Sequence, residues 1–76
     1  MKANRTLDCL GLYCPMPIIK TAEMIKEMNV GHVLEIVADD PGIEEDMPSW
    51  CKMTGHEYLG QDIDGDEFHV FVKKVK

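Results

Sequence analysis

Apolar and polar positions alternate along residues 5–10, and a longer stretch with helical spacing follows them. Leu7 and Cys9 fall on one side of the first stretch, which indicates a strand. Residues 15 to about 28 are predicted to form a helix, because apolar side chains recur there at helical spacing: Ile18, Ala22 and Ile25.

A second strand is predicted over residues 33–38, with three residues that face inward: Leu34, Ile36 and Ala38. A strand, a helix and a strand this close in sequence form a right-handed crossover with parallel strands. Both strands then end at the same edge of the sheet, so residues 39–42 are expected beside the loop that precedes the first helix. Open α/β sheets usually place their chemistry at this edge.

A second helix is predicted to end at Gly55. Asp40 and Pro41 suit its N-cap and its first position. Pro48 lies inside it and predicts a kink or two short pieces, because proline removes a backbone hydrogen bond. One side of this helix is apolar: Ile43, Met47, Trp50 and Cys51.

Residues 56–63 and 67–75 are predicted as two further strands, joined by a tight turn at Asp64 and Gly65. The order of elements predicts an α/β fold, a two-layer sandwich (βαβαββ) with a four-stranded mixed sheet and both helices on one face. The open face of the sheet would be polar: Thr6, Asp8, Glu35, His69 and Lys73. The 76 residues suffice for one core, so a single domain over residues 1–76 is expected.

The composition argues against several classes of protein. No apolar run is long enough to cross a membrane or to act as a signal peptide, so a soluble cytoplasmic protein is expected. Three cysteines at irregular spacing do not suit a secreted disulfide scaffold. The net charge of −6 opposes direct binding to nucleic acid or anionic lipid and favours partner proteins with basic surfaces. We expect a monomer.

Residues 11–17 contain the candidate reactive group. Pro15 and Pro17 suit the first turn of a helix, where a missing N–H is tolerated, and Cys14 then lies at or near the N-cap. The positive end of the helix and its free N–H groups would stabilise a thiolate and lower the pKa of Cys14. The competing interpretation is a small buried cysteine that only packs before a proline-led helix.

Other cysteine chemistry fits the chain poorly. A dithiol motif would need a second cysteine where Pro17 stands. A cysteine hydrolase needs a histidine and a substrate cleft, for which the chain is too short. Apart from the loose pair Cys51 and His56, the potential metal ligands have no familiar zinc spacing, so neither a metal nor a cofactor is expected. These potential ligands are Cys9, Cys14, Cys51, His32, His56 and His69. A single activated thiol without a cleft suits a carrier that accepts a group from one protein and gives it to the next.

Several short motifs follow one another along the chain: Leu7-Asp8 before Gly11-Leu12, Cys14-Pro15-x-Pro17, Ala38-Asp39-Asp40-Pro41, Asp46-x-Pro48 with Trp50-Cys51, and Gly55-His56-Glu57. In this order and spacing, the region from Leu7 to about Val72 resembles the TusA family of small sulfur carriers, which is also called SirA-like. The resemblance implies the same two-layer sandwich.

The resemblance also implies a function. Cys14 would take a sulfane sulfur, typically from a cysteine desulfurase, hold it as a persulfide and pass it to an acceptor protein. The onward route in the family leads to tRNA 2-thiouridine synthesis, to sulfur oxidation or to cofactor assembly. Four residues are expected to support Cys14: Gly11, Pro15, Pro17 and Asp40.

Two residues depart from the family pattern. Tyr13 stands where many members have a basic residue, so one source of thiolate stabilisation is missing. Cys9 stands where the family usually has no thiol. Cys9 and Cys14 flank one loop and could form a resolving pair or a redox switch, but a strand residue that faces the core is the preferred interpretation for Cys9. Packing of the second helix is preferred for Cys51.

Two further alternatives remain open. A non-catalytic regulatory or interaction module, with a purely structural Cys14, would also fit the acidic composition. Asp39 and Asp40 have two interpretations as well. In the preferred one, Asp40 caps the second helix and Asp39 is solvated. In the other, both dock a partner beside Cys14, where their charge would disfavour the thiolate.

Overall fold

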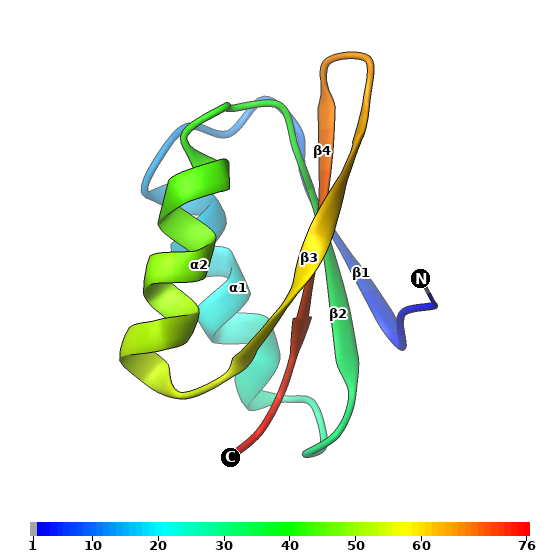
Figure 1. The fold of residues 1–76 in the computed structure, drawn as a ribbon, viewed down its shortest axis with the longest axis vertical. Coiled ribbons are helices and arrows are strands. Elements are labelled where there is room, and N and C mark those ends of the chain that lie inside the picture. Colours follow the sequence, from blue (N-terminus) through cyan, green and yellow to red (C-terminus); the bar gives the residue numbers. More distant parts are fainter. Residues whose placement is uncertain (1) are drawn as a thin grey trace.

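A computed structural model describes residues 2–76. Its elements follow the predicted order: β1 (Arg5–Cys9), α1 (Met16–Lys26), β2 (Val33–Ala38), α2 (Ile43–Thr54), β3 (Glu57–Asp64) and β4 (Glu67–Lys73). The four strands form one sheet in the order β1-β2-β4-β3, and both helices cover the same face of it (Figure 1). The predicted two-layer α/β sandwich with a mixed sheet is confirmed.

The strand pairing brings two loops to one edge of the sheet. β1 and β2 are parallel, and their last residues, Cys9 and Ala38, are partners in the register. Ala38 also pairs with Phe68 of the antiparallel β4. The loop after β1 and the turn after β2 therefore leave the sheet together, at the top of Figure 1. The predicted parallel pairing of the two strands across the first helix is confirmed.

The core lies between the sheet and the two helices. The predicted inward residues of β2 are fully buried, and α2 buries most of its predicted apolar side. In α1 the buried positions include Thr21 in place of the predicted Ala22, and the Thr21 hydroxyl donates to the carbonyl of Pro17 at 2.7 Å. The buried apolar cluster consists of Cys9, Ile25, Met28, Leu34, Ile36, Ala38, Ile43, Met47, Cys51, Phe68, Val70 and Val72.

Both helices begin later than predicted. α1 starts at Met16, with Pro15 as its N-cap and Pro17 in its first turn. α2 starts at Ile43, so the prediction of Asp40 as its N-cap and of Pro41 as its first residue is wrong. The cause is that the Asp40 carboxylate closes a turn ahead of the helix, where it accepts the N–H of Gly42 at 3.1 Å.

Two further predictions in the second half need correction. α2 continues through Pro48 as one helix, because the missing N–H removes a single bond while the buried side of the helix holds it against the sheet. The turn between β3 and β4 is made by Gly65 and Asp66, one residue later than predicted, since Gly65 has the positive φ of 60° that such a two-residue loop requires.

β3 is an edge strand with an irregular register. The pairing with β4 shifts between Tyr58 and Gly60, and Gly60 has a φ of 129°. Such a shift is a β-bulge, which bends the strand and interrupts its ladder. The bulge lies in the half of β3 that follows α2.

The open face of the sheet carries the predicted polar residues, but the buried apolar side chains of Val37 and Phe71 also lie on it. Thr6 donates to Glu35 at 3.2 Å, and the His69 ring lies 2.7 Å from Glu35 and 3.2 Å from Glu67. The hydrogen bond to Glu35 is the main reason that the pKa of His69 is raised above its usual range. Within residues 2–76, none of the helices has the length and apolar character that a membrane crossing requires.

Candidate functional site

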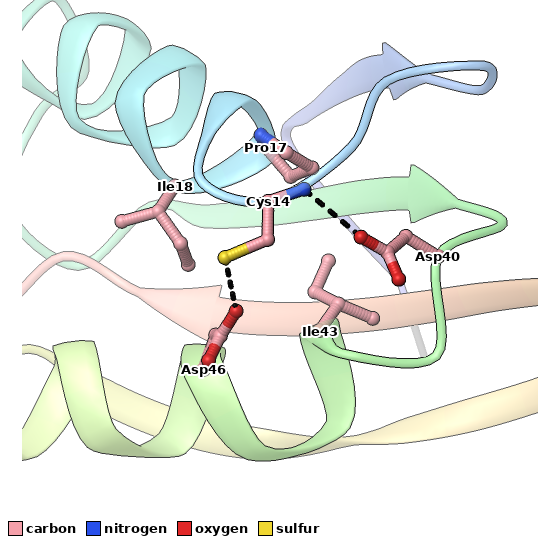
Figure 2. A pocket seen from close by; sticks show the side chains of 6 residues that line it. All are labelled: Cys14, Pro17, Ile18, Asp40, Ile43 and Asp46. Carbon is pink, nitrogen blue, oxygen red and sulfur yellow. Dashed lines mark hydrogen bonds between the residues drawn. The ribbon is translucent and has the colours of Figure 1, made fainter.

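Cys14 lies in the loop between β1 and α1, with its side chain exposed. It borders a small hollow of about 170 Å³, part of which is open solvent. Figure 2 shows the thiol pointing between Ile18 of α1 and Ile43 of α2. The residues that line the hollow are Cys14, Pro17, Ile18, Asp40, Ile43 and Asp46.

Two aspartates fix the loop that carries the thiol. Asp40 accepts the backbone N–H of Cys14 at 2.9 Å, and Asp39 accepts the N–H of Gly11 at 3.1 Å. Gly11 has a φ of 79°, a conformation that residues with a Cβ rarely adopt. The predicted closeness of the two loops is therefore confirmed, whereas the prediction of a merely solvated Asp39 is wrong.

Asp46, in the first turns of α2, is in direct contact with the thiol. The Cys14 S–H donates to Asp46 Oδ2, with 2.8 Å between sulfur and oxygen. This hydrogen bond raises the pKa of Cys14 above its ordinary value, and lost solvation and the charges of Asp46 and Asp40 act in the same direction. The predicted lowering of the Cys14 pKa is therefore wrong.

The start of α1 explains why the helix does not compensate for these charges. Pro15 and Pro17 have no N–H to offer. The N–H of Met16 is donated to the Tyr13 carbonyl at 2.8 Å, and that of Ile18 to the Pro15 carbonyl at 3.1 Å. The free N–H groups on which the prediction relied are thus absent or already bonded. The Asp46 carboxylate, in contrast, lies directly against the sulfur. The Cys14–Pro15 peptide bond is cis.

The other two cysteines belong to the core. Cys9 is 0% exposed and Cys51 is 2% exposed. Burial is the main cause of a raised pKa for Cys9, and it raises the pKa of Cys51 to about 11. Both positions agree with the preferred interpretations of these residues as packing residues.

The cysteines and histidines that were considered as potential metal ligands do not converge. Among residues 2–76, no group of three or more histidine, cysteine or acidic side chains is arranged to hold a metal ion. His56 stacks on Trp50 with 5.6 Å between ring centroids, and His69 lies on the open face of the sheet.

Sequence reasoning missed the contact between Asp46 and the thiol, although Asp46 stood in one of the motifs. A signal was present: the crossover brings the start of the second helix to the edge with Cys14, and Asp46 lies three residues after the inward Ile43. The hollow beside Cys14 is a shallow depression that is open to solvent, so it does not overturn the expectation of a chain without a substrate cleft.

Known proteins resemble this chain in sequence and in fold. The family model described as sulfurtransferase TusA matches residues 5–74. The chain is 49% identical over 74 residues to YrkF and 39% identical over 74 residues to YrkI, both candidate sulfur carrier proteins of Bacillus subtilis (strain 168). These matches cover 97% of this chain in each case, but 40% of YrkF and 99% of YrkI.

A crystal structure of the SirA-like protein from Desulfitobacterium hafniense has the same fold. The TM-score is 0.77 at 24% identity, with 95% of this chain and 99% of that chain covered. At this identity the likeness concerns the architecture of the sandwich.

Proposed function

The chain belongs to the TusA family, and on this basis we propose that it is a sulfur carrier that holds a sulfane sulfur as a persulfide on Cys14. In this proposal the sulfur donor is a cysteine desulfurase. The acceptor is another protein of a sulfur relay, such as one that ends in tRNA thiolation. The net charge of −6 supports basic docking surfaces on both partners.

The observation that carries the proposal is the placement of Cys14. It is exposed at the edge of the sandwich, whereas Cys9 and Cys51 are buried. The hollow beside it is too small to enclose a substrate, so the group that reacts with the thiol has to be presented by another molecule. A carrier needs this arrangement, because its cysteine must reach two different proteins in turn.

Loading is an exchange between sulfur atoms. The Cys14 thiolate attacks the outer sulfur of a donor persulfide, R–S–SH. The S–S bond of the donor breaks, a new S–S bond forms to Cys14 Sγ, and the donor leaves as R–S⁻. In discharge, an acceptor thiolate takes the outer sulfur in the same way and Cys14 leaves as a thiolate. Neither step requires an external oxidant or reductant.

Intact mass measurement tests the proposal. The protein is incubated with a cysteine desulfurase that holds its pyridoxal phosphate, together with cysteine. We expect a mass gain of one sulfur atom that a reductant reverses, that persists in Cys9→Ser and Cys51→Ser, and that is absent from Cys14→Ser. Circular dichroism of each variant verifies that it folds, since Cys9 and Cys51 are core residues. A gain that remains in Cys14→Ser contradicts the proposal.

The raised pKa of Cys14 favours a second candidate, a non-catalytic interaction module. Slow alkylation of the free protein would fit both candidates, because Asp46 disfavours the thiolate in either case. The mass experiment separates them, since an interaction module gains no sulfur from a desulfurase. The redox switch between Cys9 and Cys14 has less support, because Cys9 is fully buried.

A further inference from the structure

Asp46 is the side chain that contacts the reacting atom of the proposed carrier. Its Oδ2 lies 2.8 Å from Cys14 Sγ. Figure 2 shows that Asp40 approaches the same residue from another side, toward its backbone nitrogen. Asp40 therefore holds the loop in place, while Asp46 acts on the sulfur itself.

The surroundings of the thiol leave Asp46 without a counter-charge. The charged groups that line the hollow are Asp46 from α2 and Asp40 from the turn before it, and α1 contributes the uncharged Pro17 and Ile18. Throughout residues 2–76, neither lysine nor arginine forms an ion pair with an aspartate or glutamate, and the ion pairs present involve His69. Nothing in the described chain neutralises the carboxylate that faces the sulfur.

We propose that Asp46 is a control residue of the carrier: its carboxylate holds Cys14 as an unreactive thiol in the free protein, and sulfur transfer takes place in a state in which this contact is broken. The inference rests on the proposed function. The partner breaks the contact when it docks, and the thiol proton is then lost to solvent.

The Asp46 carboxylate slows both directions of transfer, by its hydrogen bond before loading and by its charge after loading. Before loading, the hydrogen bond from the Cys14 S–H to Asp46 keeps the fraction of thiolate low, and only the thiolate attacks a persulfide. After loading, Sγ carries the outer sulfur, and discharge requires Sγ to leave as a thiolate. A carboxylate beside Sγ disfavours that charge, so Cys14 is a poor leaving group and stray small thiols remove the sulfur slowly. The carrier thereby keeps its cargo between partners.

The pH dependence of Cys14 alkylation tests this proposal on the free protein. Rates with iodoacetamide are measured by peptide mapping in the native chain, in Asp46→Asn, and in Glu45→Gln as a matched control. Glu45 is an exposed acid of the same helical turn, so its replacement removes the same charge without touching the thiol. We expect Asp46→Asn to shift the profile to lower pH and to raise the rate near neutral pH several-fold, because the hydrogen bond to the carboxylate no longer favours the thiol over the thiolate. Glu45→Gln should follow the native profile.

Superimposed profiles for the native chain and Asp46→Asn would overturn the proposal. Asp46→Ser serves as a second variant if the asparagine variant does not fold, and it should shift the profile in the same direction. A further readout uses the persulfide form and its half-life with glutathione, which Asp46→Asn should shorten. If no persulfide forms on native Cys14, the proposed function fails, while the alkylation profile still decides what Asp46 does to the thiol.

Discussion

The Asp40 carboxylate joins the two loops of the site, because Asp40 Oδ2 accepts the N–H of Cys14 at 2.9 Å while Oδ1 accepts that of Gly42 at 3.1 Å. The first bond reaches across 26 positions of the chain, and the second closes the turn before α2. One side chain thus sets the distance between the thiol loop and the helix that carries Asp46.

Asp40→Ala should lower the melting temperature, and the loss should depend on pH. The N–H of Cys14 and then that of Gly42 lower the pKa of Asp40 below its ordinary value of 3.8. Stability from a carboxyl with a lowered pKa is present above the ordinary value and is lost as the pH falls through the folded value. The difference between native chain and variant should therefore be a few degrees near neutral pH and shrink toward about pH 2.

Thermal melts over that pH range measure the effect of Asp40. Glu45→Ala is the control, since it removes an exposed acid of α2 without a bond to the loop. A difference between native chain and Asp40→Ala that stays constant down to about pH 2 would contradict the role assigned to the carboxylate.

Gly11→Ala should destabilise the protein, whereas Gly42→Ala should not. Gly11 has a φ of 79°, and an L-residue in that conformation costs about 1–2 kcal/mol. Gly42 has a φ of −58°, and a Cβ there would lie 3.5 Å from Asp40 Oδ1, an ordinary contact. Its replacement should leave the free energy of unfolding unchanged or raise it by about 0.4–1 kcal/mol. Urea unfolding of both variants measures the change in the free energy of unfolding. Equal losses in the two variants would show that the backbone conformation at the glycine does not determine the change.

Alkylation of the folded protein should be confined to Cys14. The thiol of Cys51 has a pKa of about 11 because it is buried, and burial raises the pKa of Cys9 as well. Both side chains are also out of reach of a reagent in solution. Peptide mapping after brief treatment with iodoacetamide should find one labelled site, and three after denaturation. Labelling of Cys9 in the folded chain at the rate of Cys14 would support a reactive pair.

His69→Gln should lower the thermal stability of the protein more at acid pH than at basic pH. Glu35, and then Glu67, raise the pKa of His69 above its ordinary value of 6.5. A raised pKa contributes stability that is fully present below the ordinary value and is lost as the pH rises through the folded value. Thermal melts at about pH 5.5 and about pH 9 should show the larger difference at the lower pH. Glu35→Gln is the companion variant, and an NMR titration should then find the ring less basic.

The fold was predictable because its signals are repeated along the chain. The alternation in β2 and the helical spacing before it define the crossover, and the crossover alone brings the Cys14 loop to the turn at Asp39 and Asp40. Helix starts were less predictable, since Pro15 and Asp40 each fit several positions of a first turn. Their actual places depend on bonds between the two loops, which no local pattern contains.

The electrostatics of the site were not predictable from one helix. The prediction weighed the positive end of α1 and did not count the acceptors that use its N–H groups, such as the Tyr13 carbonyl. It also left out Asp46, which lies 32 positions from Cys14 in the chain and meets it only through the packing of α2 beside α1. The direction of a pKa shift depends on such contacts between elements.

The bulge between Tyr58 and Gly60 has a consequence beyond this molecule. β3 is an outer strand of the sheet, and an unbroken outer strand is a template on which further chains assemble into fibrils. A second molecule aligned along β3 would find its hydrogen-bonding groups out of step at the bulge, and repelling carboxylates beyond it at Asp62 and Asp64. This edge is therefore a poor template for the growth of a fibril.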